Sequence, residues 1–84
     1  MKAVVRIRLR PEVLDAPGRA VAEALRADGF SEVRDVRIGK LVEVDLATDD
    51  AAEARRRLAM MGERLLAHPV VETFDIDLPD GDAR

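Results

Sequence analysis

The stretch EVRDVRIGKLVEVDLA, residues 32–47, decides the fold that the sequence predicts. On both sides of Gly39-Lys40, apolar residues alternate with charged ones, which is the pattern of a β-strand with one buried face. A two-residue connection that begins with glycine fits a type II′ turn, because glycine adopts the backbone angles that this turn requires. The stretch therefore predicts a β-hairpin. Its alternating apolar positions are Val36 and Ile38 before the turn and Val42, Val44 and Leu46 after it.

Before the hairpin, the sequence predicts one strand and one helix. Residues 2–10 alternate between apolar and charged residues, and Pro11 follows where this strand would end. Asp15 is a suitable N-cap for the helix, because its carboxylate can accept hydrogen bonds from the first turn. Pro17 suits that first turn, and Gly29 suits the position just after the last. The helix residues expected to face inward are Val21, Ala24 and Leu25.

After the hairpin, the sequence predicts a second helix and a last strand. Asp50 and Glu53 form a pattern like a capping box at the start of this helix, and His68-Pro69 ends it. Gly62 lies inside the helix, where glycine costs about 1 kcal/mol relative to alanine, so we expect close backbone contact there. Alternation over residues 70–78 predicts the strand. The buried stripe of the helix is expected to contain Ala51, Ala54, Leu58, Met61, Gly62 and Leu65.

The order of these elements is β-α-β-β-α-β, which is the ferredoxin-like pattern. We expect an α+β fold in two layers, with a four-stranded antiparallel sheet and both helices on one of its faces. A chain of 84 residues is long enough for one domain. We assign this single domain to residues 1–78 and expect residues 79–84 to be a flexible C-terminal tail.

The other face of the predicted sheet would carry a stripe of arginines flanked by acidic residues of the neighbouring strands. Opposite charges across strands stabilise a sheet by roughly 0.2–1 kcal/mol per pair. The stripe is therefore either neutralised within the sheet or is the face that meets a second subunit. The arginines are Arg6, Arg8 and Arg10, and the flanking residues are Glu43, Asp45, Asp75 and Asp77.

The composition excludes several classes of function. With 14 basic and 17 acidic residues the net charge is −3, which argues against sequence-independent binding of nucleic acid. The chain has no cysteine, so it has no disulfide and no thiolate metal site. It contains no apolar run near the ~18–20 residues that a membrane span needs, and its first residues do not form the apolar segment of a signal peptide. We expect a cytoplasmic protein that binds neither nucleic acid nor a membrane.

No catalytic constellation is evident. Ser31 and His68 are the only serine and the only histidine, and the predicted fold does not bring them together. His68 is expected to cap the last carbonyl groups of the second helix. A metal ion would have to bind to carboxylates alone, and Asp49-Asp50 is better explained as the start of a helix. We expect no catalytic residue, no cofactor site and no metal site.

Met60 is a candidate for a contact with a partner. On the helical wheel of the second helix, it lies on the solvent side among Glu53, Arg56 and Glu63. A single exposed methionine is common, so a partner contact and an ordinary surface position are both open at this stage.

Three segments of the chain resemble the PurS family, the small subunit of phosphoribosylformylglycinamidine (FGAM) synthase. They are EVLDAPGRAVAEAL at 12–25, GFSEVRDVRIGKLVEVDL at 29–46 and LLAHPVVETFDIDL at 65–78. The motif V-L-D-x-x-G, followed by V-x-x-V-R-x-G-K, fixes several spacings at once. The chain departs from the family pattern at Ala16, where the family usually has proline, and at His68, where it commonly has asparagine.

The resemblance implies a protein without a catalytic site of its own. PurS associates with a glutaminase subunit, PurQ, and with a synthetase subunit, PurL, which uses ATP and Mg²⁺. The assembly converts formylglycinamide ribonucleotide (FGAR), glutamine and ATP to FGAM, glutamate, ADP and phosphate. The resemblance further implies that PurS holds the other subunits together, assists the transfer of ammonia, and forms homodimers or dimers of dimers.

Arg37, Gly39 and Lys40 belong to the part of the chain most characteristic of this family, and we expect them to support contacts within the assembly. A solvated turn is the alternative for these residues. Two other classes of protein compete with the subunit. An ACT-like regulatory module shares the β-α-β-β-α-β order, and an amino acid ligand would stabilise it. An acylphosphatase-like hydrolase typically orients water with asparagine, which this chain lacks. The further candidates for partner contacts are Arg6, Arg8, Arg10 and Met60.

Overall fold

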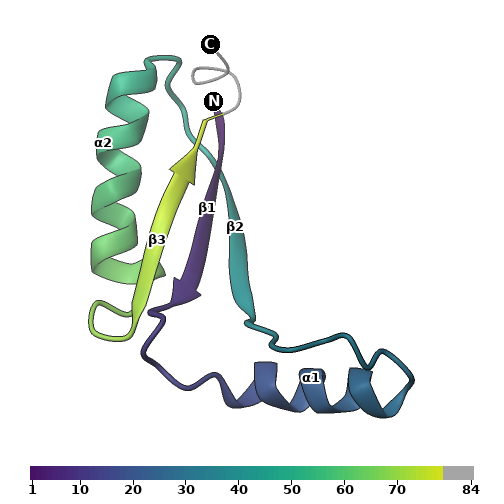
Figure 1. Cartoon of the computed structure of the whole chain (residues 1–84). Coiled ribbons are helices and arrows are strands. Elements are labelled where there is room, and N and C mark those ends of the chain that lie inside the picture. Colours follow the sequence, from purple (N-terminus) through teal and green to yellow (C-terminus); the bar gives the residue numbers. More distant parts are fainter. Residues whose placement is uncertain (79–84) are drawn as a thin grey trace.

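The computed structural model describes residues 1–78, and the predicted tail, residues 79–84, lies outside the described residues. Figure 1 shows the strands and one helix together, with the other helix projecting from one end of the sheet. In chain order, the elements are β1 (Lys2–Leu9), α1 (Ala16–Ala27), β2 (Gly39–Asp45), α2 (Ala51–Met61), the π-helix η1 (Gly62–Leu66) and β3 (Glu72–Asp77).

The sheet has the strand order β2-β1-β3, and β1 pairs antiparallel with both neighbours. Successive side chains of a strand point to opposite faces, so directly opposed residues share a face. Val5 of β1 lies opposite Val42 of β2 and Ile76 of β3, which gives the sheet one apolar face. The predicted α+β fold with an antiparallel sheet is confirmed, with three strands rather than four over the described residues.

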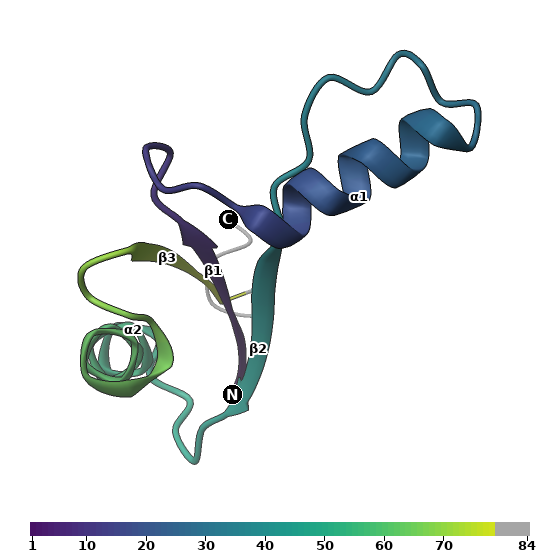
Figure 2. The same cartoon turned by 90° about the horizontal axis from the view of Figure 1, so that it is seen from below.

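The core lies between this apolar face and α2, which runs alongside the sheet in Figures 1 and 2. Asp50 caps α2 as predicted, because its carboxylate accepts hydrogen bonds from the N–H groups of Ala52 and Glu53 at 3.0 and 3.3 Å. Burying one large apolar side chain stabilises the fold by roughly 1.5–3 kcal/mol. The largest fully buried side chains are Val5, Ile7, Leu58 and Leu78.

Gly62 lies where α2 passes into η1, and Phe74 of β3 packs against it. A Cβ atom at Gly62 would overlap the Phe74 ring, so the close approach expected at this glycine is made by a side chain and not by another backbone segment. The π-helical turn shifts the phase of the helix, because its hydrogen bonds span one more residue than those of an α-helix. Leu65, predicted in the buried stripe, is consequently 83% exposed, whereas Leu66 and Ala67 pack against the core.

The predicted hairpin is wrong. Residues 33–38 form no strand, and Gly39 and Lys40 are the first two residues of β2 rather than a turn. Gly39 pairs with Arg8 of β1, so the position expected at the tip of a hairpin lies inside the sheet.

The register of β2 gives the physical reason. A two-residue turn would set Ile38 opposite Leu41, and Leu41 shares the charged face of the sheet with Arg6. Val42 shares the apolar face with Val5. The hairpin would therefore place the apolar residues of its two strands on opposite faces of the sheet, which loses burial on one of them.

The prediction that both helices cover one face is also wrong, because α1 leaves the sheet. α1 and the segment 28–38 that returns from it project from the end of the sheet at which β1 ends (Figures 1 and 2). We call residues 16–38 the arm. Val21 and Ala24, expected to face inward, are exposed, and Ala22 is buried instead. The radius of gyration is 16.1 Å, whereas a compact domain of this length has about 12 Å.

Candidate functional site

The two ends of the arm meet at its base, where Asp15 joins them. The Asp15 carboxylate accepts a hydrogen bond from the N–H of Gly18 at 2.8 Å and another from the N–H of Ile38 at 2.6 Å. Asp15 is the N-cap of α1, as predicted, and only 5% of it is exposed. These two bonds tie the start of α1 to the residue that precedes β2.

The surroundings of Asp15 keep its carboxyl group charged. The hydrogen bond from Ile38 lowers the pKa of Asp15 most, the bond from Gly18 lowers it further, and the Arg37 guanidinium adds to this effect, while burial opposes it. The N-terminus of a helix also favours negative charge. Sequence reasoning identified the cap but missed the bond to Ile38, because no local pattern links residues 23 positions apart.

Two glycines allow close backbone packing at the base of the arm. A Cβ atom at Gly18 would overlap the carbonyl oxygen of Val36. A Cβ atom at Gly39 would lie 2.6 Å from the carbonyl oxygen of Ile7 in β1. Gly39 therefore allows β1 to approach closely, and it does not form the turn that the sequence predicted.

Arg37 and Lys40, two of the predicted contact residues, lie on either side of Gly39. Arg37 donates a hydrogen bond to the carbonyl oxygen of Arg10 at 3.0 Å. The Lys40 Nζ lies 3.6 Å from a carboxylate oxygen of Glu72. Both side chains are exposed, so they stay accessible to a partner, although the charged group of each already has a contact within the chain.

A hollow of about 540 Å³ opens between the base of the arm and the charged face of the sheet. Its lining combines cationic and apolar side chains, which suits a protein segment that carries carboxylates and an apolar residue. The structure thus brings the predicted residues Arg6, Arg8, Arg37, Gly39 and Lys40 to one place. The hollow is lined by these five residues together with Ile7, Leu9, Pro11, Ile38 and Leu41.

The arginine stripe is paired on its β3 side. Arg6 lies 3.0 Å from Asp77 and Arg8 lies 3.5 Å from Asp75, as the strand order predicted. On the β2 side the prediction is wrong, because Glu43 and Asp45 lie opposite Val4 and Lys2, and Arg6 and Arg8 lie opposite Leu41 and Gly39. Arg10 does not belong to the stripe, contrary to expectation, because β1 ends at Leu9. Its guanidinium instead donates hydrogen bonds at 3.0 and 3.2 Å to the two carbonyl oxygens of Pro69-Val70, ahead of β3. Arg10 is thus a structural residue of the base.

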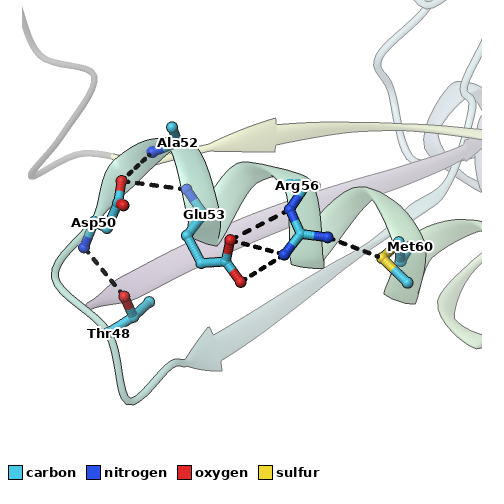
Figure 3. A network of polar contacts seen from close by, with 6 residues as sticks. All are labelled: Thr48, Asp50, Ala52, Glu53, Arg56 and Met60. Carbon is cyan, nitrogen blue, oxygen red and sulfur yellow. Dashed lines mark hydrogen bonds and ion pairs between the residues drawn. The ribbon is translucent and has the colours of Figure 1, made fainter.

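Met60 lies on α2 and lines a different hollow from Arg37 and Lys40. Figure 3 shows its sulfur beside the Arg56 guanidinium, at 3.9 Å, and Arg56 in turn forms an ion pair with Glu53 at 2.7 Å. The expected neighbours Glu53 and Arg56 are therefore present. Met60 itself is half-buried rather than fully on the solvent side.

The hollow at Met60 is a groove between α2 and β2 that sequence reasoning missed. It measures about 400 Å³ and is lined mostly by apolar side chains, with two arginines among them. The change of helix phase at η1 creates it by turning Leu65 outward, and the alternation of apolar residues carries no signal of such a change. We call it the α2–β2 groove. It is lined by Val44, Arg57, Met60, Met61, Arg64, Leu65 and Leu66.

Other polar groups of the chain serve local structure. The His68 Nδ1 accepts a hydrogen bond from the N–H of Val70 at 3.2 Å, so the ring caps a turn and not the helix carbonyl groups that were expected. Ser31 is exposed in the arm. Over residues 1–78, no group of three or more His, Cys, Asp or Glu side chains could hold a metal ion. Within the same residues, no helix is both long and apolar enough to cross a membrane.

Comparison with known proteins gives the family. The family model PurS, phosphoribosylformylglycinamidine (FGAM) synthase, matches residues 2–80. The chain belongs to the PurS family. The PurS subunit of FGAM synthase from Synechocystis is 40% identical over 72 residues, which are 86% of this chain and 72% of that protein. PurS of Mycobacterium leprae is 43% identical over 75 residues, which are 89% of this chain and 91% of that protein.

Solved structures agree with this assignment. Methanocaldococcus jannaschii PurS superposes with a TM-score of 0.82 at 30% identity, over 90% of this chain and 92% of that chain. A chain of the PurLQS structure from Thermotoga maritima superposes with a TM-score of 0.83 at 25% identity, over 90% of this chain and 93% of that chain. The open arrangement of arm and sheet is thus shared with PurS structures.

The residues through which the sequence resembles the PurS family meet at the base of the arm. The aspartate and glycine of V-L-D-x-x-G are Asp15 and Gly18, which hold the start of α1. Three residues of the second motif are Val36, packed on Gly18, Arg37, bound to the Arg10 carbonyl, and Gly39, packed on β1. The two motifs therefore pack against each other and together form the base of the arm.

Proposed function

We propose that this chain is the small subunit of FGAM synthase, the ligase of purine biosynthesis that converts FGAR, glutamine and ATP to FGAM, glutamate, ADP and phosphate. The observation that carries the proposal is the family match over residues 2–80. The similarity to a chain of the PurLQS structure supports a PurL synthetase and a PurQ glutaminase as partners.

The chain holds PurL and PurQ together and assists the transfer of ammonia from the glutaminase site to the synthetase site. It has no catalytic residues and binds no cofactor, and PurL uses the ATP and Mg²⁺. The complex works in the cytoplasm. The geometry suits a scaffold, because Arg6, Arg8 and Lys40 form exposed ion pairs within the chain that hold these cations on a surface a protein partner can reach.

Two surfaces carry the contacts with the larger subunits. The first is the base of the arm, where Arg37, Gly39 and Lys40 border the hollow that Arg6 and Arg8 also line. The exposed cations there favour an acidic partner segment and steer its approach. The second is the end of α2 around Met60, whose flexible side chain adapts to an apolar partner surface.

The shape of the chain supports a homodimer, which can pair further into a dimer of dimers. The chain exposes 6050 Å², whereas a compact protein of its mass of 9.3 kDa exposes about 5,000 Å². The excess of roughly 1,000 Å² exceeds the ~800 Å² that each partner buries in a standard protein interface. An isolated copy with a projecting arm therefore leaves more of its surface exposed than a compact protein of the same mass.

Complex formation tests the proposal. The purified chain is mixed with PurL and PurQ of the same organism and run on gel filtration in the presence of the substrates. We expect this chain to elute with both larger subunits and PurQ to elute separately from PurL when the chain is left out. A chain that never elutes with either subunit would overturn the proposal.

A further inference from the structure

The arm carries its positive charge on one side. Residues 16–38 contain four basic and four acidic residues, so the arm as a whole is neutral. All four basic residues nevertheless line one hollow of about 300 Å³, to which both α1 and the returning segment contribute. Three of the four acidic residues of the arm do not line it. We call it the arginine hollow, and its basic residues are Arg19, Arg26, Arg34 and Arg37.

The spacing of residues along α1 explains why two of these arginines lie on the same side. Arg19, Ala22 and Arg26 follow one another at intervals of three and four residues, so they share one face of the helix. Ala22 is buried and lines the hollow between the two longer side chains. Arg34 and Arg37 come from the returning segment. Each of the two walls of the hollow thus contributes two arginines.

Hydrogen bonds join the two walls at both ends of the hollow. At the base of the arm, the Asp15 carboxylate accepts the N–H groups of Gly18 and Ile38. Farther along α1, the Arg26 guanidinium donates a hydrogen bond to the carbonyl oxygen of Val33 at 3.0 Å. The hollow therefore exists before any ligand binds, and a preformed site lowers the entropy that binding costs.

The arginine hollow has an excess of positive charge. Its acidic lining residues are Asp15 and Asp35, so four guanidinium groups and two carboxylates give it a net charge of +2. The Asp15 carboxylate already accepts two backbone N–H groups. The Asp35 carboxylate accepts the N–H of Val36 at 3.0 Å. The carboxylates are thus partly occupied by the backbone, and the excess charge is left for an anion to neutralise.

Most hydrogen-bond donors of the arginine hollow are available. Arg19 and Arg34 form no hydrogen bond and no ion pair within residues 1–78. Arg26 and Arg37 each donate one hydrogen bond to a backbone carbonyl oxygen, whereas a guanidinium has five N–H donors. Like charges held on facing walls also repel one another. An anion between the walls would accept these donors and remove the repulsion.

We propose that the arginine hollow binds a small ligand that carries a phosphate group. A phosphate monoester has a charge of about −1.5 to −2 at neutral pH, which matches the charge of the hollow, whereas one carboxylate would neutralise half of it. Guanidinium groups also bind phosphate oxygens through paired, parallel hydrogen bonds. The proposal goes beyond the proposed function and does not depend on it.

The size and lining of the hollow restrict the ligand further. Sites for small molecules measure about 300–1,000 Å³, so this hollow admits free phosphate or a compact phosphate ester. Leu14 and Val36 add apolar surface that can contact the body of an ester. Because arginines of both walls bind the same phosphate group, the bound ligand joins α1 to the returning segment and stiffens the arm.

Titration of the wild-type chain, followed by the backbone amide resonances, tests the site. Inorganic phosphate and ribose 5-phosphate replace chloride at constant ionic strength, because salt screens exposed charges. We expect the amides of Ala22 and residues 34–37 to shift and to saturate, and those of α2 to stay unchanged. Ribose, which has no phosphate group, should cause no shift. Tighter binding of ribose 5-phosphate would identify an ester as the ligand, and equal affinity would identify free phosphate.

Charge variants assign the binding to the hollow. Arg19→Gln/Arg34→Gln removes two guanidinium groups and should weaken phosphate binding about tenfold. The matched control Arg57→Gln/Arg64→Gln changes the net charge equally at the α2–β2 groove and should leave the affinity unchanged. Arg19→Lys/Arg34→Lys keeps the charges but loses the paired donors, so it should bind about threefold more weakly than wild type. This variant decides the question if the glutamine variant does not fold.

Three results would overturn the proposal. Shifts that do not saturate, or an equal loss of affinity in the control variant, would show a response to net charge and not a site. Equal binding of acetate would show that the hollow does not select phosphate. Wild-type affinity in both the glutamine and the lysine variants would place the binding elsewhere. None of these measurements involves PurL or PurQ, so the proposed role in FGAM synthase is judged separately.

Discussion

The Asp15 carboxylate lies 2.6 Å from the backbone nitrogen of Ile38 and accepts its hydrogen bond across 23 positions of sequence. A single side chain therefore caps α1 and also holds the residue from which β2 begins. This relationship fixes the direction of the arm and, with it, the position of Arg37 and Lys40. We expect assembly to depend on it more than on any local charge.

Asp15→Asn should lower the melting temperature at neutral pH by roughly 4–8 °C, the effect of losing a good N-cap bond in a small domain. The asparagine amide cannot accept both N–H groups as a carboxylate does. The lowered pKa of Asp15 sets the pH dependence, because a depressed pKa stabilises the fold only while the group is ionised. Melting curves of both proteins at a series of pH values measure the difference.

The difference between wild type and Asp15→Asn should be full above the ordinary pKa of 3.8 and should disappear as pH falls through the lower pKa of the folded state. A difference in melting temperature that stays constant down to acidic pH would show that the charge of Asp15 does not act through these hydrogen bonds.

Gly62→Ala should destabilise the fold by about 1–3 kcal/mol, because the added methyl group overlaps the Phe74 ring. Without that overlap, alanine would stabilise a helix by about 1 kcal/mol relative to glycine, so the sign of the effect is informative. Urea unfolding measures it. The double variant Gly62→Ala/Phe74→Leu is the control, and it should be more stable than the sum of the two single effects predicts.

Lys40→Glu should weaken binding to the larger subunits about tenfold, because it reverses a charge at the base of the arm where an acidic partner segment is expected. Titration of labelled chain with PurL and PurQ measures the change. The matched control is Lys40→Glu/Glu72→Lys, which restores the ion pair within the chain in the opposite sense. Full binding by the double variant would assign the loss to that pair, and unchanged binding by Lys40→Glu alone would refute the contact.

Arg8→Ala should lower the free energy of unfolding by less than about 1 kcal/mol, because both side chains of the ion pair between Arg8 and Asp75 are exposed. Salt should reduce the effect further, since it screens exposed charges. Urea unfolding at low and high salt gives both values. A cost of several kcal/mol would show that this face of the sheet is buried against a second subunit.

Much of the fold was predictable because its signals are local. The alternation along residues 2–10 and 70–78 lies in β1 and β3, and Asp15 and Asp50 both cap helices. The ion pair between Arg6 and Asp77 also follows from the strand order alone. In each case the pattern depends on residues close in sequence or on one standard arrangement of strands.

The features of the fold that could not be predicted depend on strand register and on contacts between residues far apart in the sequence. Glycine at position 39 is compatible with a turn, but a two-residue turn would set Ile38 opposite Leu41 and so place the apolar residues of its two strands on opposite faces. The pairing of Leu41 with Arg6 and of Val42 with Val5 agrees with this argument. The outward direction of α1 depends on the bond from Ile38 to Asp15, which no periodicity reveals. Leu65 follows the helical spacing of a buried residue and is exposed because the helix changes phase at Gly62.

The most direct test of the proposed function compares two nitrogen sources. PurL and PurQ of the same organism are assayed for FGAM formation with glutamine and, separately, with ammonium, each with and without this chain. The account predicts that glutamine-dependent synthesis requires the chain and that ammonium-dependent synthesis does not. Glutamine-dependent synthesis at the same rate without the chain would contradict it.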